Sequence, residues 1–575
     1  MWIIDFFKAN CKNCYACVRS CPVDAIKVQS EQAKIVEERC IGCGKCLKVC
    51  PKNAKHVQSE LEKVKLYLKQ EEQVVVSLAP SFAALWEMEK IEKLPAVLKK
   101  LGVMAVEETV IGAQPVTSVY EMYTKMPGDQ CYITSCCPTV NALIQKHYPE
   151  IIPFLIPVVS PVACHAKMIK QKYGEDVKVV FIGPCLSKKI EGRQEEALDA
   201  VLTFEELVEW LNEEAVEWDA LPAMSFDATE EKQRRYPIVG GATYTINHEK
   251  MPRKIIHIDG IEECKDMLPH ILEGAFKNTL IEMHGCRHSC IQGAGMPQDH
   301  INIYERRERI KQYANEQVAA KPSTSNDVNA SAYADIVVNL HKDFPNLKVA
   351  LRTPSEEEMQ KILSSIGKET KLDELNCGCC GYNTCRDKAV AVYNGMAEPN
   401  MCLPFMRQKA ETLTNVIFET TPNLIIMVNT DLEIIEVNPA AKSFFGLTQE
   451  SRSNIPIQTL MEEVYFKEVM YKRSSVLNQK VYLKDSDSTV VQSIIWSEYH
   501  NIMLWIANDV TYDERNSKKL QKMKIEAIDM AQQVINKQMT VAQEIASLLG
   551  ETTAETKVTL TKLKQLIQEE EAVKK

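Results

Sequence analysis

The sequence predicts a multidomain chain in which small α+β domains and one α/β domain precede an α-helical tail. Three observations support this organisation. The length of 575 residues exceeds what one hydrophobic core usually spans. All 21 cysteines lie at or before Cys402, so thiol chemistry is confined to the earlier domains. Residues 513–575 consist mainly of helix-forming residues, with no Pro and a single Gly.

Composition also limits the compartment and the partners of the chain. The N-terminal residues MWIIDFFKANCKNC lack the basic start, the apolar core and the small-residue cleavage site of a signal peptide. No apolar run reaches the roughly 18–20 residues that a membrane span needs. We therefore expect a cytoplasmic protein, in which clustered thiols stay reduced and serve metal binding or catalysis. The net charge of −10 argues against nucleic acid as the main partner.

The first predicted domain, residues 1–58, contains two copies of one cysteine pattern. The spacing Cys-x2-Cys-x2-Cys-x3-Cys-Pro spans 11–22 and recurs at 40–51. This repeat resembles the bacterial two-cluster ferredoxins, in which three cysteines of one copy and the last cysteine of the other hold each 4Fe–4S cluster. The resemblance implies an α+β, ferredoxin-like electron-transfer domain, with zinc as the alternative for any CxxC pair. It implies two ligand sets, which are Cys11, Cys14, Cys17 and Cys50, and Cys40, Cys43, Cys46 and Cys21.

The second predicted domain, residues 70–350, has the alternation of apolar runs and helical stretches that is typical of an α/β fold. VVVSLAP (74–80) and VKVVFIGPC (177–185) have the composition of buried strands. FEELVEWL (204–211) has the spacing of an amphipathic helix. Loops that follow such strands converge at one end of the sheet, where α/β proteins usually place their sites.

Three cysteine segments lie within this domain. They read ITSCCPTV (133–140), FIGPCLSKKIE (181–191) and IEMHGCRHSCIQGAGMP (281–297). These segments resemble the three signature loops of FeFe-hydrogenases. In that family a 4Fe–4S cluster is joined through one cysteine to a diiron unit with CO, cyanide and dithiolate ligands, and the two together form the H-cluster. The resemblance implies 4Fe–4S ligands at Cys137, Cys185, Cys286 and Cys290, with Cys290 also joining the diiron unit.

The same resemblance implies roles for residues around the diiron unit. Cys136, beside the ligand Cys137, matches the thiol that relays protons to the bridging amine. Lys188 matches the lysine that donates a hydrogen bond to one cyanide, which suits an ammonium group and an anionic ligand. Pro80 and Ser81 match the segment that packs against the other cyanide.

Other thiols and histidines of this domain match no ligand. We expect Cys131, Cys164 and Cys264 to be buried core residues, as free cysteines often are. His284 and His288 flank the ligand Cys286 and have two interpretations. They either donate hydrogen bonds that shift the cluster potential or are polar residues of a surface loop.

The chain departs from fast hydrogenases around the cofactor. Those enzymes resemble one another in a proton path of two glutamates and a serine, and the matching positions here are Tyr120, Tyr123 and Ile156. Tyr has a pKa of about 10 and Ile carries no exchangeable proton, so neither relays protons well near neutral pH. Two methionines that usually lie near the cluster are replaced by Gly183 and His284. We expect a retained cofactor with slow turnover or shifted potentials.

The third predicted domain, residues 355–408, contains the cysteine pattern Cys377-x2-Cys380-x4-Cys385-x16-Cys402. It resembles a small four-cysteine 4Fe–4S module of electron-transfer proteins, with zinc as the alternative metal. Cys379 is an additional thiol, either an alternative ligand or a neighbour of the cluster. The resemblance implies a fourth 4Fe–4S cluster, after the two of the ferredoxin-like domain and the one of the H-cluster. Its ligands would be Cys377, Cys380, Cys385 and Cys402.

The fourth predicted domain, residues 412–512, contains no cysteine. NLIIMVNTDLEIIEVNPAAKSFFGLT (423–448) predicts two short strands, a turn and a helix that begins at Asn438-Pro439. IIWSEYHNIMLWIANDVT (494–511) predicts a closing hairpin. This arrangement resembles a PAS domain. Since no His or Cys marks a haem or flavin site, we expect its pocket to be filled by its own core.

The fifth predicted segment, residues 513–575, is a helical coiled-coil tail. Gly550 suits a helix end, and Thr552-Thr-Ala-Glu555 matches a capping box that begins a second helix. Helical hairpins paired across a homodimer would form a four-helix bundle, with a plain dimerisation stalk as the alternative. The heptad seam holds Leu520, Met523, Ala527, Met530, Val534, Val541 and Leu548, with polar residues at Lys537 and Glu544.

Together these domains predict an H2-sensing FeFe-hydrogenase that splits H2 slowly and reversibly and passes its redox state through iron–sulfur clusters to the PAS domain and tail. No histidine follows His500, so the tail lacks the residue that histidine kinases autophosphorylate. The expected partners are H2, protons, a redox partner such as ferredoxin, maturation proteins and a separate signalling kinase, phosphatase or regulator. The alternatives are a conventional ferredoxin-linked hydrogenase and a non-catalytic iron–sulfur scaffold on the same fold.

Overall fold

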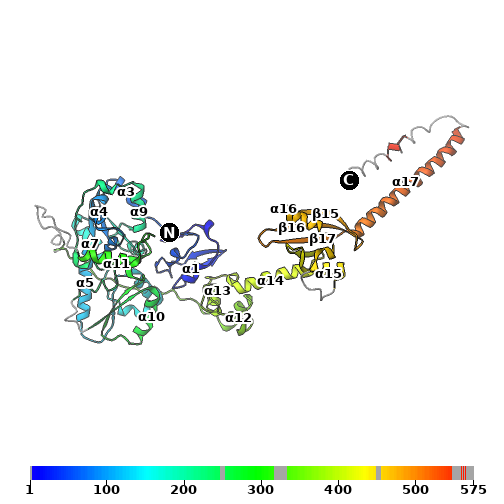
Figure 1. The fold of residues 1–575 in the computed structure, drawn as a ribbon. Helices are drawn as coiled ribbons and strands as arrows, with labels where there is room; N and C mark the ends of the chain where they lie inside the picture. Colours follow the sequence, from blue (N-terminus) through cyan, green and yellow to red (C-terminus); the bar gives the residue numbers. More distant parts are fainter. Residues whose placement is uncertain are drawn as a thin grey trace. The chain divides into compact units, whose positions relative to one another are not determined.

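The computed structural model describes residues 3–246, 253–315, 335–447 and 455–546, together with positions 333, 558, 559, 561, 562 and 564. The chain divides into two compact units, Met1–Met406 and Arg407–Lys575 (Figure 1). Among the described residues, no helix combines the length and the apolar character that a membrane crossing needs.

The N-terminal part of the first unit pairs short antiparallel strands around short helices. Strand β1 pairs with β4 and β2 pairs with β3. Each helix carries the third cysteine of one copy of the repeat, Cys17 in α1 and Cys46 in α2. The result is an α+β arrangement in which the cysteine loops flank a small apolar core. The elements are β1 (Ile4–Phe6), α1 (Ala16–Ser20), β2 (Ile26–Gln29), β3 (Gln32–Ile35), α2 (Lys45–Lys48) and β4 (Lys55–Val57).

Two parallel sheets form the centre of the first unit. The strand order is β6-β5-β8-β9 in one sheet and β10-β11-β7 in the other. The strands expected at 74–80 and 177–185 are confirmed as β5 and β8, and β5 is buried along its whole length, as in sheets covered on both faces. The strands are β5 (Val74–Leu78), β6 (Ala105–Glu108), β7 (Tyr132–Ile133), β8 (Lys178–Gly183), β9 (Ala200–Thr203), β10 (Lys254–Asp259) and β11 (Thr279–His284).

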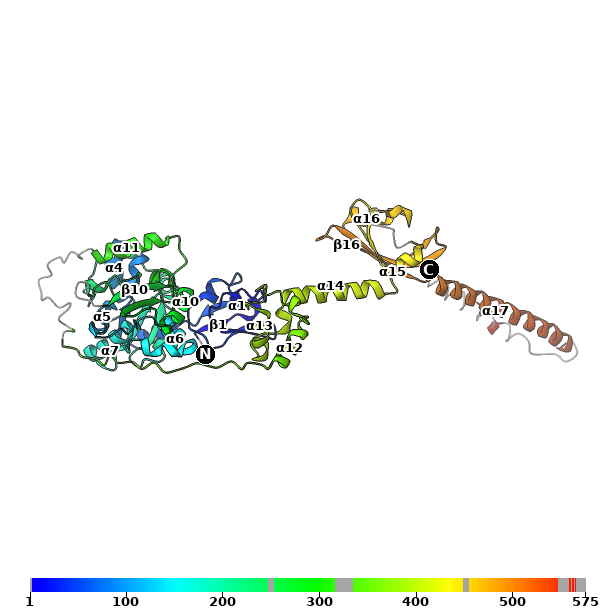
Figure 2. The same ribbon diagram turned by 90° about the horizontal axis from the view of Figure 1, so that it is seen from below.

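Helices surround these sheets in both views (Figure 1, Figure 2). The helix expected at 204–211 is confirmed as α9, and a capping box between Thr203 and Glu206 fixes its first turn. The thiols of Cys131, Cys164 and Cys264 are buried, as expected. The helices are α3 (Leu61–Lys69), α4 (Met88–Lys100), α5 (Val110–Lys125), α6 (Pro138–His147), α7 (Pro161–Tyr173), α8 (Ser187–Gly192), α9 (Phe204–Glu213), α10 (Ile261–Leu272) and α11 (Ile303–Asn315).

The parallel strands place their carboxyl ends around one site. Ala79 to Ser81 follow β5, and Thr109 follows β6. Cys136 follows β7, Cys185 follows β8 and Cys286 follows β11. These loops line a common cavity, which is the convergence that the α/β pattern predicts.

Helices α12 (Glu356–Ser365) and α13 (Cys385–Tyr393) form a small module that packs on the ferredoxin-like part. The Val28 N–H donates to the Met396 carbonyl at 2.9 Å, which joins β2 to the module. The Arg19 guanidinium donates to the Cys379 carbonyl at 3.2 Å. Both views show α13 beside α1 (Figure 1, Figure 2).

The second unit contains a six-stranded antiparallel sheet in the order β14-β13-β12-β17-β16-β15. The strands, the helix opened by the Asn438 cap and the closing hairpin are those expected from the sequence. Trp505 and Phe466 fill the interior, in line with the expected self-filled core. The elements are β12 (Leu424–Val428), β13 (Glu433–Val437), α15 (Pro439–Phe445), β14 (Ile455–Pro456), α16 (Val464–Lys472), β15 (Val476–Leu483), β16 (Ser488–Ser497) and β17 (Ile502–Asp509).

Helices flank this sheet in the sequence. Helix α14 (Leu403–Thr420) precedes it, and α17 (Thr511–Ala546) follows it. The side chains of the expected heptad seam that lie in α17, such as Met530 and Val534, are exposed along the helix. The expected helix end at Gly550 and the capping box at 552–555 lie outside the described residues.

Candidate metal centres

The ferredoxin-like part brings its cysteines together in two groups of four. Cys11, Cys14, Cys17 and Cys50 line a cavity of about 20 Å³. In the other group, burial raises the pKa of Cys43 to about 12, with smaller contributions from the neighbouring Cys21 and Cys40. Burial is likewise the main cause that raises the pKa of Cys46, and the same three thiols contribute. The groups are those that the ferredoxin resemblance implies, each mixing cysteines from both copies of the repeat.

The cavity at the strand ends has a volume of about 100 Å³. Apolar side chains such as Ala79, Val162 and Phe181 also form part of its walls. Burial raises the pKa of Cys185 to about 11, and Cys137 adds to this effect. The predicted site residues that line it are Pro80, Ser81, Cys136, Cys137, Cys185, Lys188, Cys286 and Cys290.

The neighbouring thiols Cys136 and Cys137 differ in their surroundings. The Cys136 side chain is buried, with Sγ 4.0 Å from Thr134 Oγ1, and burial raises its pKa to about 12. Cys137 Sγ accepts a hydrogen bond from the Gly285 N–H at 3.4 Å. The first thiol therefore keeps its proton, while the second already accepts a backbone donor of the kind that supports a metal-bound thiolate.

Tyr120, Tyr123 and Ile156, which the sequence resemblance matches to two glutamates and a serine of a proton path, belong to the same apolar cluster as Cys136. Tyr120 is completely buried, and its hydroxyl accepts a hydrogen bond from the Ser135 N–H at 3.2 Å. Burial and the nearby Cys136 raise the pKa of Tyr120, so it does not ionise near neutral pH. Ile156 is also completely buried, whereas Tyr123 is half-buried and packs edge-on against Tyr132.

Lys188 is paired within the protein. Its ammonium donates to Glu191 Oε2 at 2.5 Å, and Ser160 Oγ donates to the same oxygen at 3.0 Å. Burial raises the pKa of Glu191, but the charges of Lys188 and Lys342 more than offset this and lower it to about 2. Lys188 thus keeps a fixed position on the cavity wall through an ionised partner.

His284 and His288, which had two interpretations, lie in different surroundings. His284 is buried on the cavity wall, with Nε2 2.9 Å from Glu282 Oε1. His288 is half-buried, and its backbone has the left-handed conformation. Its N–H donates to Asp259 Oδ2 at 2.6 Å. The geometry favours a role beside the cluster for His284 and a loop role for His288.

Several cavity residues were not identified from the sequence. Thr109 and Tyr236 both line the cavity, and Tyr236 OH lies 3.2 Å from Thr117 Oγ1. Thr109 had one weak signal, because it directly follows a strand of the parallel sheet. No motif marks Tyr236, which comes from an irregular segment far from the three cysteine loops in sequence.

The small module gathers its own four cysteines. Cys377, Cys380, Cys385 and Cys402 line a cavity of about 20 Å³. Cys379 is absent from this lining, which favours the interpretation that it is a neighbour of the site. The Cys402 carbonyl accepts the Met406 N–H at 2.9 Å, so the last of these cysteines also begins helix α14.

The ferredoxin-like part is in close contact with the loops of the strand-end cavity. Ser187 Oγ donates to the Ile41 carbonyl at 3.0 Å. A Cβ at Gly44, where φ is +71°, would lie 2.3 Å from the Cβ of Ala294. The loop from Cys40 to Cys46 therefore lies directly against the segments that carry Cys185 and Cys290.

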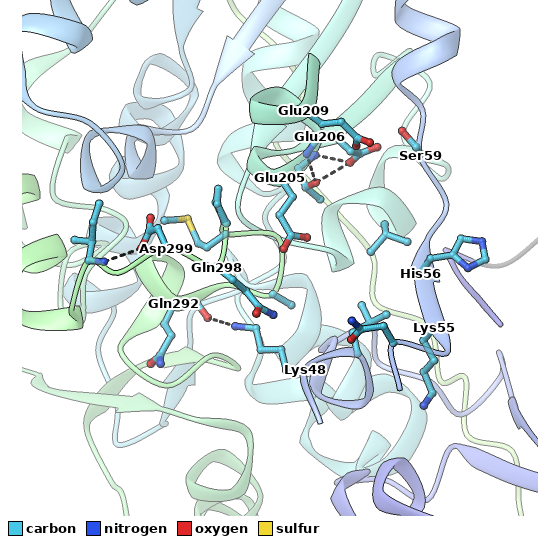
Figure 3. Close-up of a pocket in the computed structure, with 18 of the residues that line it drawn as sticks. Lys48, Lys55, His56, Ser59, Glu205, Glu206, Glu209, Gln292, Gln298 and Asp299 are labelled. Carbon is cyan, nitrogen blue, oxygen red and sulfur yellow. Dashed lines mark hydrogen bonds between the residues drawn. The ribbon is translucent and has the colours of Figure 1, made fainter. Parts of the chain in front are cut away.

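A larger hollow of about 580 Å³ lies beside this contact and is lined by polar side chains (Figure 3). Lys48 Nζ donates to the carbonyls of Gln292 and Gly293, each at 3.2 Å, and so links α2 to the third cysteine loop. Glu205 also lines it, and burial raises the pKa of that carboxyl group. The hollow contains no cysteine among its lining residues and marks the seam between the domains.

Within the part of the chain that the structure describes, no group of three or more His, Cys, Asp or Glu side chains is arranged to hold a single metal ion. A 4Fe–4S cluster takes one thiolate on each of four different irons, so its ligands lie farther apart than those of a single ion.

Comparisons with known proteins give four family matches. Residues 72–294 match the family model described as iron only hydrogenase large subunit, C-terminal domain. Residues 2–51 match a 4Fe-4S dicluster domain, 372–404 match an Fe-S cluster family, and 412–477 match a PAS domain. The chain is thus a multidomain protein with a hydrogenase-type domain, iron–sulfur domains and a PAS domain.

Individual relatives cover parts of the chain. It is 26% identical over 263 residues to the periplasmic Fe hydrogenase large subunit of Nitratidesulfovibrio vulgaris, covering 36% of this chain and 62% of that protein. The match thus spans less than two thirds of the relative. A variant of the FeFe-hydrogenase HydA1 from Chlamydomonas reinhardtii matches with 18% identity and a TM-score of 0.39, over 51% of this chain and 100% of that structure. The PAS domain of Bordetella pertussis BvgS matches with 18% identity and a TM-score of 0.16, over 21% of this chain and 98% of that structure.

Proposed function

Since the chain contains an iron-only hydrogenase domain together with iron–sulfur and PAS domains, we propose that it is an H2 sensor. In this proposal H2 is split slowly and reversibly in the strand-end cavity, and the electrons change the oxidation state of the clusters. The observation that carries the proposal is the composition of that cavity, where Cys136 and Lys188 lie on the same wall as four further cysteines.

The residues of the cavity fit an H-cluster. Cys137, Cys185 and Cys286 would hold the 4Fe–4S part, and Cys290 would hold it and join the diiron unit. When bound, the diiron unit supplies the metal site at which H2 is split into protons and electrons. The ammonium of Lys188, which lines the cavity, suits an anionic cyanide ligand.

Slow turnover is supported by the surroundings of Cys136. The buried Tyr120 has a raised pKa, and Ile156 has no proton to pass, so these positions do not continue a proton path from the thiol. A sensor needs an equilibrium response to H2 rather than a high flux. A conventional ferredoxin-linked hydrogenase would need both positions to relay protons rapidly.

Transmission to the PAS domain is supported by the packing of the cluster domains. Tyr382 of the module lies close enough to Cys21 for that thiol to contribute to the raised pKa of the tyrosine. The last module cysteine, Cys402, directly precedes α14, which leads into the PAS domain. A change of cluster charge at this point can bias the PAS domain and tail between two arrangements.

We further propose the partners that this function requires. A redox partner such as ferredoxin would exchange electrons with the clusters, and maturation proteins would install the diiron unit. The exposed heptad positions of α17 would pair in a homodimer. The output would reach a separate kinase, phosphatase or regulator in the cytoplasm. A non-catalytic iron–sulfur scaffold is disfavoured by the presence of Cys136, Lys188 and Cys290 together in one cavity.

The experiment that tests the proposal is an infrared spectrum of anaerobically matured protein in the CO and cyanide region, under argon and then under H2. We expect bands that shift with H2, together with turnover far below that of fast hydrogenases under saturating mediator. Absence of the bands would support the scaffold alternative. Bands with fast turnover would support the conventional hydrogenase.

A further inference from the structure

A continuous series of hydrogen-bonded side chains runs from the strand-end cavity toward the protein surface. Thr109 lines the cavity, and its Oγ1 lies 2.8 Å from Ser77 Oγ. Ser77 Oγ lies 2.9 Å from His165 Nδ1, and His165 Nε2 lies 3.0 Å from Glu107 Oε2. Lys172 Nζ donates to Glu107 Oε1 at 2.7 Å, and the Lys172 side chain is 20% exposed. The four links join strands β5 and β6 to helix α7.

These polar side chains lie where an α/β core is normally apolar. Ser77, Glu107 and His165 have no exposed surface, and Thr109 is 4% exposed. Burying such groups costs free energy that their mutual hydrogen bonds only offset, whereas apolar residues of similar size would stabilise the core without that cost. None of the four is among the cysteine ligands or the residues expected to hold the cofactor, so stability and ligation do not explain the series.

The charge of Glu107 orients every donor in the series. Burial raises the pKa of Glu107, but hydrogen bonds from His165, Lys172 and Tyr333 lower it to about 2. The ionised carboxylate accepts from His165 Nε2–H, Lys172 and Tyr333, and from Tyr173 at 2.8 Å. In the neutral imidazole that donates through Nε2–H, Nδ1 is then left as an acceptor.

The remaining hydroxyl groups follow this orientation. Since His165 Nδ1 is an acceptor, the Ser77 hydroxyl donates to it, and Ser77 Oγ in turn accepts from the Thr109 hydroxyl. The donors from Thr109 to His165 therefore point away from the cavity, and the Lys172 ammonium donates to Glu107 from the solvent side. Such an alignment suits the movement of a proton from the cavity outward.

We propose that Thr109, Ser77, His165, Glu107 and Lys172 form the proton relay between the H2 site and solvent, which rests on the proposed hydrogenase function. A proton that reaches Thr109 displaces the Thr109 proton to Ser77, and the Ser77 proton moves to His165 Nδ1. His165 gives its Nε2 proton to Glu107. Lys172 releases one proton to water and regains one from Glu107, so every group ends with the number of protons with which it began.

A second buried carboxylate near the cavity, Glu282, accepts hydrogen bonds from backbone amides as well as from side chains. Glu282 accepts from the backbone N–H groups of Gly240 and Thr243, both at 3.0 Å, and from the Thr243 hydroxyl at 2.8 Å. Its contact with the exposed His257 passes through Thr243, whose Oγ1 lies 3.0 Å from His257 Nε2. Glu282 holds the loop of Gly240 and Thr243 in place, and it also lies 2.9 Å from Nε2 of the cavity residue His284. A second series therefore runs from His284 through Glu282 and the Thr243 hydroxyl to His257, and Thr243→Val interrupts it.

The relay can be tested with the matured full-length chain and the substitution Ser77→Ala, which interrupts the series with a minimal loss of volume. Tyr173→Phe is the matched control, because it removes one donor from Glu107 and leaves the series continuous. The CO and cyanide bands under argon report whether the cofactor is present in each variant. The rate of isotope exchange between D2 and water reports proton movement to and from the site.

We expect Ser77→Ala to retain the infrared bands and their eventual shift under H2 while its isotope exchange slows about 100-fold. Tyr173→Phe should exchange at the rate of the unsubstituted chain. Unchanged exchange in Ser77→Ala, or slow exchange in Thr243→Val alone, would overturn the relay and leave the proposed function intact. Absence of the bands in the unsubstituted chain would overturn the proposed function and the relay together.

A measurement that does not use turnover tests the orientation of His165. Nitrogen-labelled histidine spectra of the full chain with its iron–sulfur clusters and without the diiron unit distinguish the two ring tautomers, and His165→Gln assigns the signal. We expect a proton on Nε2, and a change of the Nδ1 signal in Ser77→Ala. A proton on Nδ1 would contradict the relay, since that nitrogen could then not accept from Ser77.

Discussion

At the scale of single residues, we propose that Cys136 exchanges a proton rather than binding metal. Its thiol is buried, has a pKa raised to about 12 and lines the cavity beside Cys290. Such a thiol is protonated near neutral pH and is a weak acid until a base or a developing charge approaches it. The neighbouring Cys137 accepts a backbone N–H instead. The two adjacent thiols thus differ in their surroundings, and their separate roles stay a prediction of the sequence resemblance.

We expect Cys136→Ala to lower H2 turnover about 100-fold, because the proton donor nearest the site is lost. The CO and cyanide bands should remain, since no ligand is removed. Cys131→Ala is the matched control, because Cys131 is also buried and does not line the cavity. Full turnover in matured Cys136→Ala would show that protons reach the site by another group.

Glu191, which is paired with the cavity residue Lys188, makes the unfolding free energy depend on pH in the acid range. Its pKa in the folded chain is lowered to about 2, below its ordinary value, chiefly through Lys188 and Lys342 once the opposing effect of burial is overcome. A group with a lowered folded pKa stabilises the fold above its ordinary pKa and loses that contribution as the pH falls toward 2. The difference corresponds to about 3 kcal/mol of unfolding free energy.

We therefore expect denaturant midpoints of the chain to fall as the pH decreases below about 4.5. In Glu191→Gln the midpoint should be lower near neutral pH and should depend less on pH in the acid range. Glu89→Gln, which alters the exposed pair with Lys93, should leave the curve unchanged. An unaltered acid slope in Glu191→Gln would contradict the assigned pKa.

At the scale of elements, short sequence patterns predicted the helices and strands that interactions between neighbouring residues determine. The apolar runs at 74–80 and 177–185 became strands, and the Thr203–Glu206 capping box began α9 where the periodicity predicted a helix. The family resemblances carried by the cysteine motifs implied the groups that the structure brings together. These features depend on residues that are close in sequence or carry a repeated motif.

Other elements of the site depend on contacts between distant strands and helices. Glu107 lies on β6 and His165 on α7, and neither has a neighbouring residue in sequence that marks it as polar and buried. Tyr236 reaches the cavity from an irregular segment with no periodic pattern. Only the packing of the sheet against α7 brings Ser77 to His165, so the series from Thr109 to Lys172 could not be derived from spacing.

The close approach at Gly44 tests the contact between the ferredoxin-like part and the hydrogenase-type domain. A Cβ there would lie 2.3 Å from Ala294 and 2.7 Å from a methyl group of Leu186, at a φ of +71° that disfavours other residues. Gly128 has a φ of +109° but no atom within 4 Å of a Cβ. Both glycines have a positive φ, but only Gly44 contacts another domain. Comparing Gly44→Ala with Gly128→Ala therefore separates the effect of backbone strain from the effect of losing the domain contact.

We expect Gly44→Ala to slow electron transfer from H2 to the ferredoxin-like clusters by about tenfold or more, because it separates the Cys40–Cys46 loop from the Cys185 and Cys290 loops. Rapid-mixing reduction with H2, followed by cluster absorbance, measures this rate. Gly128→Ala should reduce its clusters at the unsubstituted rate. Equal rates in both variants would show that this contact is not the electron path.

At the scale of the whole molecule, the order of domains was predictable, but the packing between them was not. The sequence separates the ferredoxin-like part from the four-cysteine module by the entire hydrogenase-type domain, yet Val18 and Tyr382 share one apolar cluster. The chain thus returns to its N-terminal clusters before it enters α14. This packing brings the module near Cys21. Cys21 belongs to the same cysteine group as Cys40, Cys43 and Cys46, whose loop contacts the segments that line the strand-end cavity.

That arrangement predicts how H2 should affect the segment before the PAS domain. If the module cluster passes redox state to α14, exposure to H2 should change amide hydrogen exchange across Leu403–Thr420. Cys380→Ser removes a residue of the module cavity, so we expect the H2-dependent change in α14 to disappear while the CO and cyanide bands still shift. Cys379→Ser alters the adjacent thiol outside that cavity and should retain the change. An H2-dependent change in Cys380→Ser equal to that of the unsubstituted chain would mean that the signal bypasses the module, because the cluster nearest the helix would then not be needed to alter it.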